Sequence, residues 1–89
     1  MIFFIYIYNV FNSKKEISIQ LGRRIRTLRI GAGKSMVDLA FESGMEYTQL
    51  SRIELGQIST SIYQLYKISE ALNIEIIDFF YIKKENENV

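Results

Sequence analysis

The most constraining feature of this sequence is a pair of short helical patterns that meet at Gly44, within residues 35–56. Ser35 can accept a hydrogen bond from a free backbone N–H group of a first helical turn, and Asp38 three residues later completes a capping box. Gly44 supplies the left-handed backbone that commonly ends a helix. The first helix therefore has room for only about two turns.

Apolar residues at helical spacing give each of these two helices one face to bury. They are Met36, Leu39 and Ala40 in the first helix, and Met45, Leu50 and Ile53 in the second. The second helix then turns a different set of side chains outward, namely Tyr47, Thr48, Gln49, Ser51 and Arg52. These side chains are rich in hydrogen-bonding groups of the kind that reads base edges, and a helix-turn-helix presents its second helix to the major groove in this way.

A wider pattern runs through four segments between Leu21 and Phe80. The segments read LGRRIRTLR, then S-x-x-x-L-A-x-x-S-G, then L-S-R-I-E-x-G, and finally SIYQLYKISEALNI. Together they resemble the Cro/CI-type (XRE) helix-turn-helix DNA-binding domains. The resemblance implies an all-α, five-helix bundle that usually works as a homodimer on a two-fold-symmetric operator in double-stranded DNA.

The resemblance also implies which residues bind DNA. The implied set lies on the outer face of the second helix: Tyr47, Thr48, Gln49, Ser51 and Arg52. In the linker before the first helix, Lys34 departs from the family, which usually has an apolar residue there, and we expect Lys34 and Ser35 to add phosphate contacts. Arg52 stands where relatives place base-reading residues, and arginine commonly bridges O6 and N7 of guanine. A phosphate contact is the alternative for Arg52. Tyr47 and Thr48 match positions that reach either bases or the sugar-phosphate backbone, while Gln49 and Ser51 are more peripheral.

Arg29 and Glu54 match positions that form a partly buried ion pair in relatives, so the resemblance implies a structural role for both. Other positions depart from the family. Met36 stands where relatives commonly have a phosphate-binding glutamine, and Glu46 brings a carboxylate to the leading end of the second helix. Glu46 suits the helix dipole or accepts a hydrogen bond from cytosine. These departures support an alternative function, a protein-interaction or antitoxin-like module with weak or no DNA binding.

The charge of the chain is strongly segregated, although its net value is only +1. Residues 14–34 carry seven basic side chains against Glu16, whereas residues 35–82 carry two basic side chains against seven acidic ones. A basic stripe of this kind either contacts phosphates or forms a solvated helix face.

The absence of cysteine and histidine from the 89 residues narrows the possible chemistry. It excludes disulfides, thiol nucleophiles and zinc sites that rely on cysteine or histidine, and no nucleophile has a base beside it. We therefore expect no enzyme activity, no cofactor and no small-molecule ligand. The length suits one domain with a core that a partner chain would help to stabilise. No segment fits a membrane span or signal peptide, so we expect a small autonomous cytoplasmic regulator.

We expect three parts along the chain. Residues 1–12 are apolar and uncharged, which favours a short β-strand. The alternatives for this segment are pairing with its copy in a second subunit, packing on the bundle, or partial disorder at the terminus. Residues 13–82 form the helix-turn-helix domain, and residues 83–89 form a polar tail.

Within the domain, further caps and apolar stripes predict three more helices. Ser13 with Glu16 starts a helix over residues 13–30, whose buried stripe is Ile17, Leu21, Ile25 and Leu28. Ser61 with Gln64 starts a helix that ends at Asn73, with the stripe Ile62, Leu65, Ile68 and Leu72. Residues 76–80 are apolar enough to predict a fifth short helix, which either closes the core or joins a dimer interface.

Overall fold

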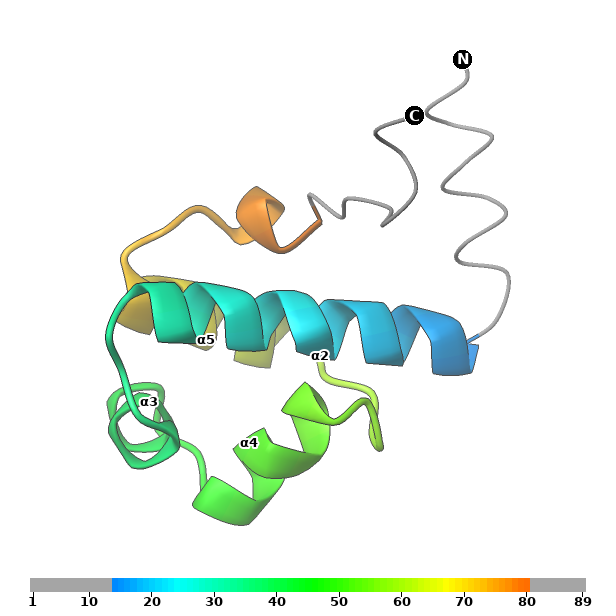
Figure 1. The fold of residues 1–89 in the computed structure, drawn as a ribbon, viewed down its shortest axis with the longest axis horizontal. Coiled ribbons are helices and arrows are strands. Elements are labelled where there is room, and N and C mark those ends of the chain that lie inside the picture. Colours follow the sequence, from blue (N-terminus) through cyan, green and yellow to red (C-terminus); the bar gives the residue numbers. More distant parts are fainter. Residues whose placement is uncertain (1–13, 81–89) are drawn as a thin grey trace.

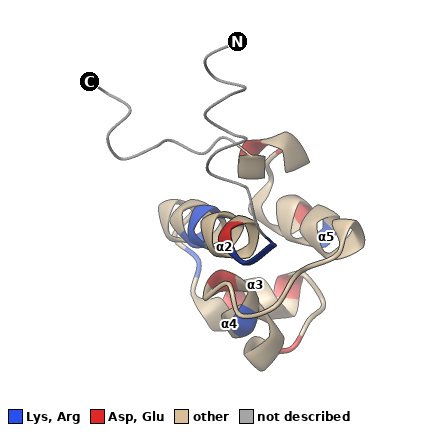
Figure 2. Cartoon of the chain, turned by 90° about the vertical axis from the view of Figure 1, so that its right-hand side faces the viewer, with Lys and Arg blue, Asp and Glu red and all other residues tan. Residues whose placement is uncertain are grey.

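A computed structural model describes residues 14–80. This part of the chain forms four α-helices and one 3-10 helix: α2 (Lys14–Gly31), α3 (Met36–Glu42), α4 (Tyr47–Glu54), α5 (Ile62–Leu72) and η1 (Ile76–Phe80). Helices α2 and α5 lie side by side in the middle, α3 and α4 lie on one side of them, and η1 lies on the other (Figures 1 and 2). The predicted helical fold is thus confirmed for this part of the chain. Helix α4 and η1 lie on opposite sides of the two central helices (Figure 1).

The predicted five-helix bundle needs one correction, because residues 76–80 form a 3-10 helix rather than a fifth α-helix. The side chain of Asp78 accepts a hydrogen bond from the Glu75 backbone N–H at 3.1 Å, and the Asp78 N–H donates to the Glu75 carbonyl at 2.9 Å. The backbone bond spans three residues, which is the pattern of the tighter 3-10 turn. The carboxylate bond caps the start of that turn. The Asp78 carbonyl accepts a hydrogen bond from Arg24 Nε at 2.8 Å, so α2 holds η1 in place. The strand predicted for residues 1–12 lies outside the described residues, as does the cap predicted at Ser13.

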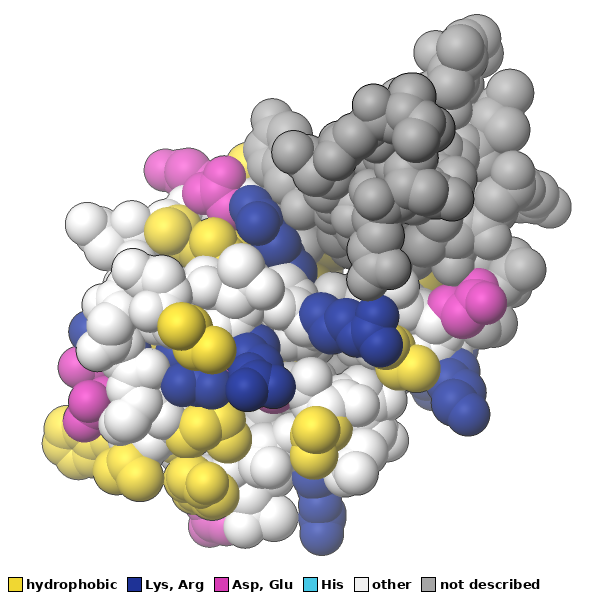
Figure 3. Space-filling model, in the orientation of Figure 1, with side chains coloured by type: hydrophobic (Ala, Val, Ile, Leu, Met, Phe, Trp, Pro, Cys, Tyr) yellow, Lys and Arg dark blue, Asp and Glu magenta, His cyan; other side chains and the backbone are white. Residues whose placement is uncertain are grey.

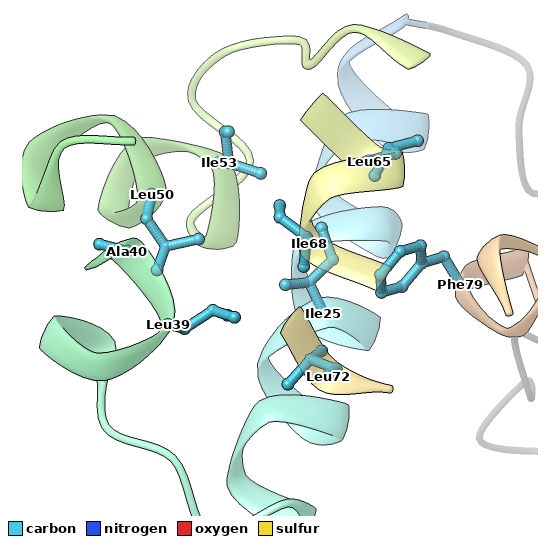
Figure 4. Packing of buried hydrophobic residues seen from close by; sticks show 9 residues of the cluster. All are labelled: Ile25, Leu39, Ala40, Leu50, Ile53, Leu65, Ile68, Leu72 and Phe79. Atoms are coloured by element: carbon cyan, nitrogen blue, oxygen red, sulfur yellow. The ribbon is translucent and has the colours of Figure 1, made fainter. Parts of the chain in front are cut away.

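The core lies between the α3–α4 pair, the two central helices and η1 (Figure 4). Every one of these elements contributes to it, through Ile25, Leu39, Ala40, Leu50, Ile53, Leu65, Ile68, Leu72 and Phe79. Most of the predicted stripes are therefore confirmed. Ile17 and Ile62 are exceptions, with 42% and 70% of their surface exposed. Each lies in the first turn of its helix, before the helix reaches the core.

The helix ends follow local rules. Ser35 Oγ accepts a hydrogen bond from the Asp38 N–H at 3.0 Å at the start of α3, as predicted, but the cap consists of this bond alone and the Asp38 side chain does not complete the predicted capping box. Ser61 and Gln64 form a complete capping box at the start of α5. That helix ends at Asn73, whose φ of 58° confirms the predicted left-handed cap. None of the helices within residues 14–80 is long and apolar enough to cross a membrane.

Candidate nucleic-acid interface

Helix α4 lies at the edge of the molecule, on the side away from η1 (Figures 1 and 2). Its inner face is fixed by Leu50 and Ile53, which are buried against α3 and the central helices (Figure 4). Tyr47, Thr48 and Arg52 are exposed, as the helical spacing predicted. Gln49 and Ser51 are only half-buried, so they lie at the margin of the outer face rather than on it.

The turn between α3 and α4 is closed by hydrogen bonds within the chain. The buried hydroxyl of Ser43 donates to the Leu39 carbonyl at 2.6 Å. Gly44 follows with a φ of 72°, a conformation that favours glycine. The Met45 N–H then donates to the Ala40 carbonyl at 2.9 Å. These contacts join the end of α3 to the start of α4, so the two helices form one helix-turn-helix unit.

The far end of α4 is joined to α2 by a two-bond ion pair between Arg29 and Glu54. Arg29 Nε lies 2.7 Å from Glu54 Oε2, and a terminal guanidinium nitrogen of Arg29 lies 3.1 Å from Oε1. Only 10% and 5% of the two side chains are exposed. The other terminal nitrogen of Arg29 donates to the Lys34 carbonyl at 3.0 Å. One guanidinium thus connects the end of α2, the α2–α3 linker and the end of α4.

Two glycines that are far apart in the sequence bring the backbones of α2 and α4 close together. A Cβ atom on Gly22 of α2 would lie 2.4 Å from the Ile53 carbonyl oxygen and 2.6 Å from that of Glu54. A Cβ atom on Gly56, just after α4, would lie 2.6 Å from Ile19 Cα. An isolated glycine inside a helical pattern can indicate such a close approach, and Gly22 is a glycine of this kind.

The two predicted contact residues at the start of α3 already have partners. Lys34 Nζ lies 2.8 Å from Glu42 Oε1, and 28% and 40% of the two side chains are exposed. The Ser35 hydroxyl accepts the capping hydrogen bond from Asp38 and keeps its own proton available for donation. The other five predicted contact residues all lie on α4, whereas Lys34 and Ser35 lie just before α3.

The predicted basic stripe is only partly available to an outside partner. Arg29 is buried in its ion pair, and Arg24 is half-buried against η1. Arg23 and Arg26 are exposed on α2. Lysine and arginine side chains nevertheless gather over α2 in the space-filling view (Figure 3). Within residues 14–80 no group of three or more Asp or Glu side chains could hold a metal ion.

Comparisons with known proteins identify the same type of domain. A family model described as helix-turn-helix matches residues 25–79. The HTH-type transcriptional regulator SlrR of Bacillus subtilis is 39% identical over 61 residues, which cover 67% of this chain and 40% of SlrR. The control protein C.BamHI of Bacillus amyloliquefaciens is 32% identical over 68 residues, which cover 72% of this chain and 84% of C.BamHI. The chain thus spans well under half of SlrR but most of C.BamHI.

Two solved structures share the fold. The restriction-modification controller protein C.AhdI from Aeromonas hydrophila superposes with a TM-score of 0.69 at 35% identity, and the match covers 70% of this chain and 94% of C.AhdI. The clp gene regulator ClgR from C. glutamicum superposes with a TM-score of 0.66 at 28% identity, over 68% of this chain and 79% of the ClgR chain.

Proposed function

Because the chain belongs to the XRE-type helix-turn-helix family, we propose that it is a sequence-specific DNA-binding transcriptional regulator. It acts at promoters by occupying DNA rather than by catalysis, in the cytoplasm of a prokaryotic cell. Relatives named as a transcriptional regulator, control proteins and a gene regulator support this class of function. The match covers most of C.BamHI and C.AhdI, and this supports the same class of function.

The single observation that carries the proposal is the outer face of α4. Its inner face is locked into the core, its two ends are joined to α3 and α2, and it leaves Tyr47, Thr48 and Arg52 exposed at the edge of the molecule. A helix of this kind can enter a major groove without unfolding any other part of the domain. Arg52 is the side chain we assign to a guanine, and Tyr47 and Thr48 contact bases or sugar-phosphate beside it.

The remaining contacts are assigned to the DNA backbone. Ser35 lies at the N-terminus of α3, where its hydroxyl and the positive end of the helix can face a phosphate. Lys34 contributes once it exchanges Glu42 for a phosphate. Gln49 and Ser51 contribute from the margin of α4. Arg23 and Arg26 are the exposed arginines of α2 that could add phosphate contacts.

We further propose that the protein binds as a homodimer on a two-fold-symmetric operator, whose half-sites would lie roughly 34 Å apart. Two segments are candidates for the interface. In η1, Ile77 and Phe80 are exposed apolar side chains on the side away from α4. The other candidate is the apolar segment of residues 1–12, paired strand to strand with its copy.

Selection of bound sites from random duplex DNA, followed by binding titrations at several salt concentrations, tests the proposal. A regulator should enrich a symmetric site and bind it more tightly than random DNA, with an affinity that falls as salt rises. Enrichment of no sequence would contradict the proposal.

One observation favours the alternative of a protein-interaction module. Phe41 is 85% exposed on α3 and Val37, one turn earlier, is also exposed, so α3 carries an apolar surface that DNA does not need. If that surface were the functional one, the selection would recover no operator, and a protein partner would protect α3 from solvent in hydrogen exchange.

A further inference from the structure

The close approach of α2 and α4 depends on the missing side chain of Gly22. A Cβ atom at this position would meet backbone atoms, because the carbonyl oxygens of Ile53 and Glu54 would lie 2.4 and 2.6 Å away. Real Cβ atoms essentially never come within 3.0 Å of another heavy atom in this way. Backbone atoms cannot rotate aside as a side chain does. Any larger residue at position 22 therefore has to push the end of α4 away from α2.

A second contact of the same kind lies one turn from the first. Gly56 follows α4 with a φ of 73°, and a Cβ atom there would lie 2.6 Å from Ile19 Cα and 2.8 Å from its Cγ1. Ile19 and Gly22 are three residues apart on α2, so they share one face of that helix. The end of α4 and its following turn therefore rest directly on one face of α2, backbone against backbone.

We propose that Gly22 is a specificity-determining positioning residue for the DNA-binding function proposed above, on which this inference rests. Its missing side chain sets the distance between α2 and α4, and this distance determines where the outer face of α4 lies relative to the rest of the domain. Gly22 touches no DNA itself. It acts through Ile53 and Glu54, the last two residues of α4.

The distance between α2 and α4 is important because hydrogen bonds to bases tolerate only small shifts. Relieving the contact at Gly22 to 3.0 Å would move the end of α4 by about 0.6 Å. Hydrogen bonds from side chains to bases lie within roughly 2.7 to 3.2 Å, so a shift of this size is as large as the whole range. The bonds made by Arg52, which directly precedes Ile53, would be lost or weakened on the correct sequence. Contacts to phosphates through flexible side chains would adapt more easily.

The test compares full-length variants by competition between the selected operator and operators with one changed base pair. For the parent protein, each such change should weaken binding by roughly 5- to 150-fold. The ratio that matters is the affinity for the selected operator divided by the affinity for an operator with one changed base pair. We expect Gly22→Ala to reduce this ratio toward one at the base pairs that α4 reads, with a smaller loss of binding to random DNA. Both sites compete in one tube, so the unfolded fraction of a variant cancels from the ratio.

Three further variants complete the design. Gly31→Ala is the matched control, since it adds the same atom to α2 where nothing lies within 4 Å. Phe79→Leu weakens the core on the side away from α4 (Figure 4), so it should lower stability and leave the ratio unchanged. Gly56→Asn adds a Cβ atom at the second contact, and asparagine accepts the left-handed backbone at this position. This variant should also reduce the ratio, so it provides the test if Gly22→Ala does not fold.

The outcomes separate this inference from the proposed function. A parent protein that prefers no sequence overturns both. A parent protein that discriminates between operators, together with Gly22→Ala and Gly56→Asn variants that discriminate equally well, overturns this inference alone. A ratio that falls to the same extent in Phe79→Leu also overturns it, because the effect would then follow general destabilisation.

Discussion

Replacing either partner of the Arg29–Glu54 ion pair should destabilise the fold far more than breaking an exposed pair of the same length. We consider Arg29→Met, Glu54→Leu and the double variant. Each single change leaves one ionised group in a site where only 10% or 5% of the side chain is exposed. An uncompensated buried charge of this kind costs about 3 to 5 kcal/mol. The double variant removes both charges at once.

The loss of stability in the double variant depends on which polar groups remain at the site. With both charges gone, the apolar replacements can pack, and substitutions of this kind are often close to neutral. The Lys34 carbonyl loses its 3.0 Å hydrogen bond from Arg29, which costs about 1 kcal/mol. The double variant should therefore lose about 1 kcal/mol, far less than the sum of the two single changes.

Urea unfolding followed by circular dichroism measures these free energies, provided that the slope of the transition is unchanged. For a domain of this size each kcal/mol shifts the Tm by about 4 to 8 °C, so thermal unfolding gives an independent check. Glu42→Gln is the matched control, because it breaks the 2.8 Å pair with Lys34, whose side chains are 28% and 40% exposed. Breaking an exposed pair should cost only about 0 to 1 kcal/mol.

Two results would refute this reasoning. A Glu54→Leu variant no less stable than Glu42→Gln would mean that burial does not make the Arg29–Glu54 pair important. A double variant that loses the full sum of the single changes would mean that the two side chains act independently.

Three other changes have expected outcomes. Arg52→Ala should cost about 1 to 3 kcal/mol on the best operator and relax preference at one base pair of each half-site, as binding titrations would show; a uniform loss on all sequences would instead indicate a phosphate contact. Arg23→Ala should weaken all sites alike and flatten the dependence of log affinity on log salt by about one unit, whereas an unchanged slope would place Arg23 on a solvated face. Ser61→Ala removes the side chain that caps α5 and should cost about 1 kcal/mol in urea unfolding, and no loss would mean that water replaces the cap.

The parts of the fold that sequence predicted well depend on neighbouring residues. A cap such as Ser61 with Gln64, or a left-handed stop such as Asn73, is complete within about one helical turn, so the sequence alone specifies it. Apolar spacing is equally local and placed Leu50 and Ile53 on the buried face of α4. It failed at Ile17 and Ile62, because periodicity gives the direction of a side chain and not where the core ends along a helix.

Contacts between distant parts of the chain were harder to predict. The guanidinium of Arg24 holds the Asp78 carbonyl, 54 residues away, so what looked like one more charge of a basic stripe helps to fix η1. No local pattern separates Arg24 from Arg23, which is exposed. Only the packing of η1 on α2 assigns the two arginines to different roles.

Gly22 shows how such a distant contact can still leave a trace in the sequence. Glycine inside a helix costs about 1 kcal/mol relative to alanine, so it is expected there only where a side chain would cost more. The structure supplies that reason, since the carbonyls at the end of α4 occupy the space of the missing Cβ atom. Gly31 lies in the same helix with nothing near it, so α2 contains both a glycine that the packing requires and one that it does not. Gly22→Ala should therefore lower the free energy of unfolding, whereas Gly31→Ala should raise it. The difference between these two changes, rather than either value alone, measures how tightly α4 is held.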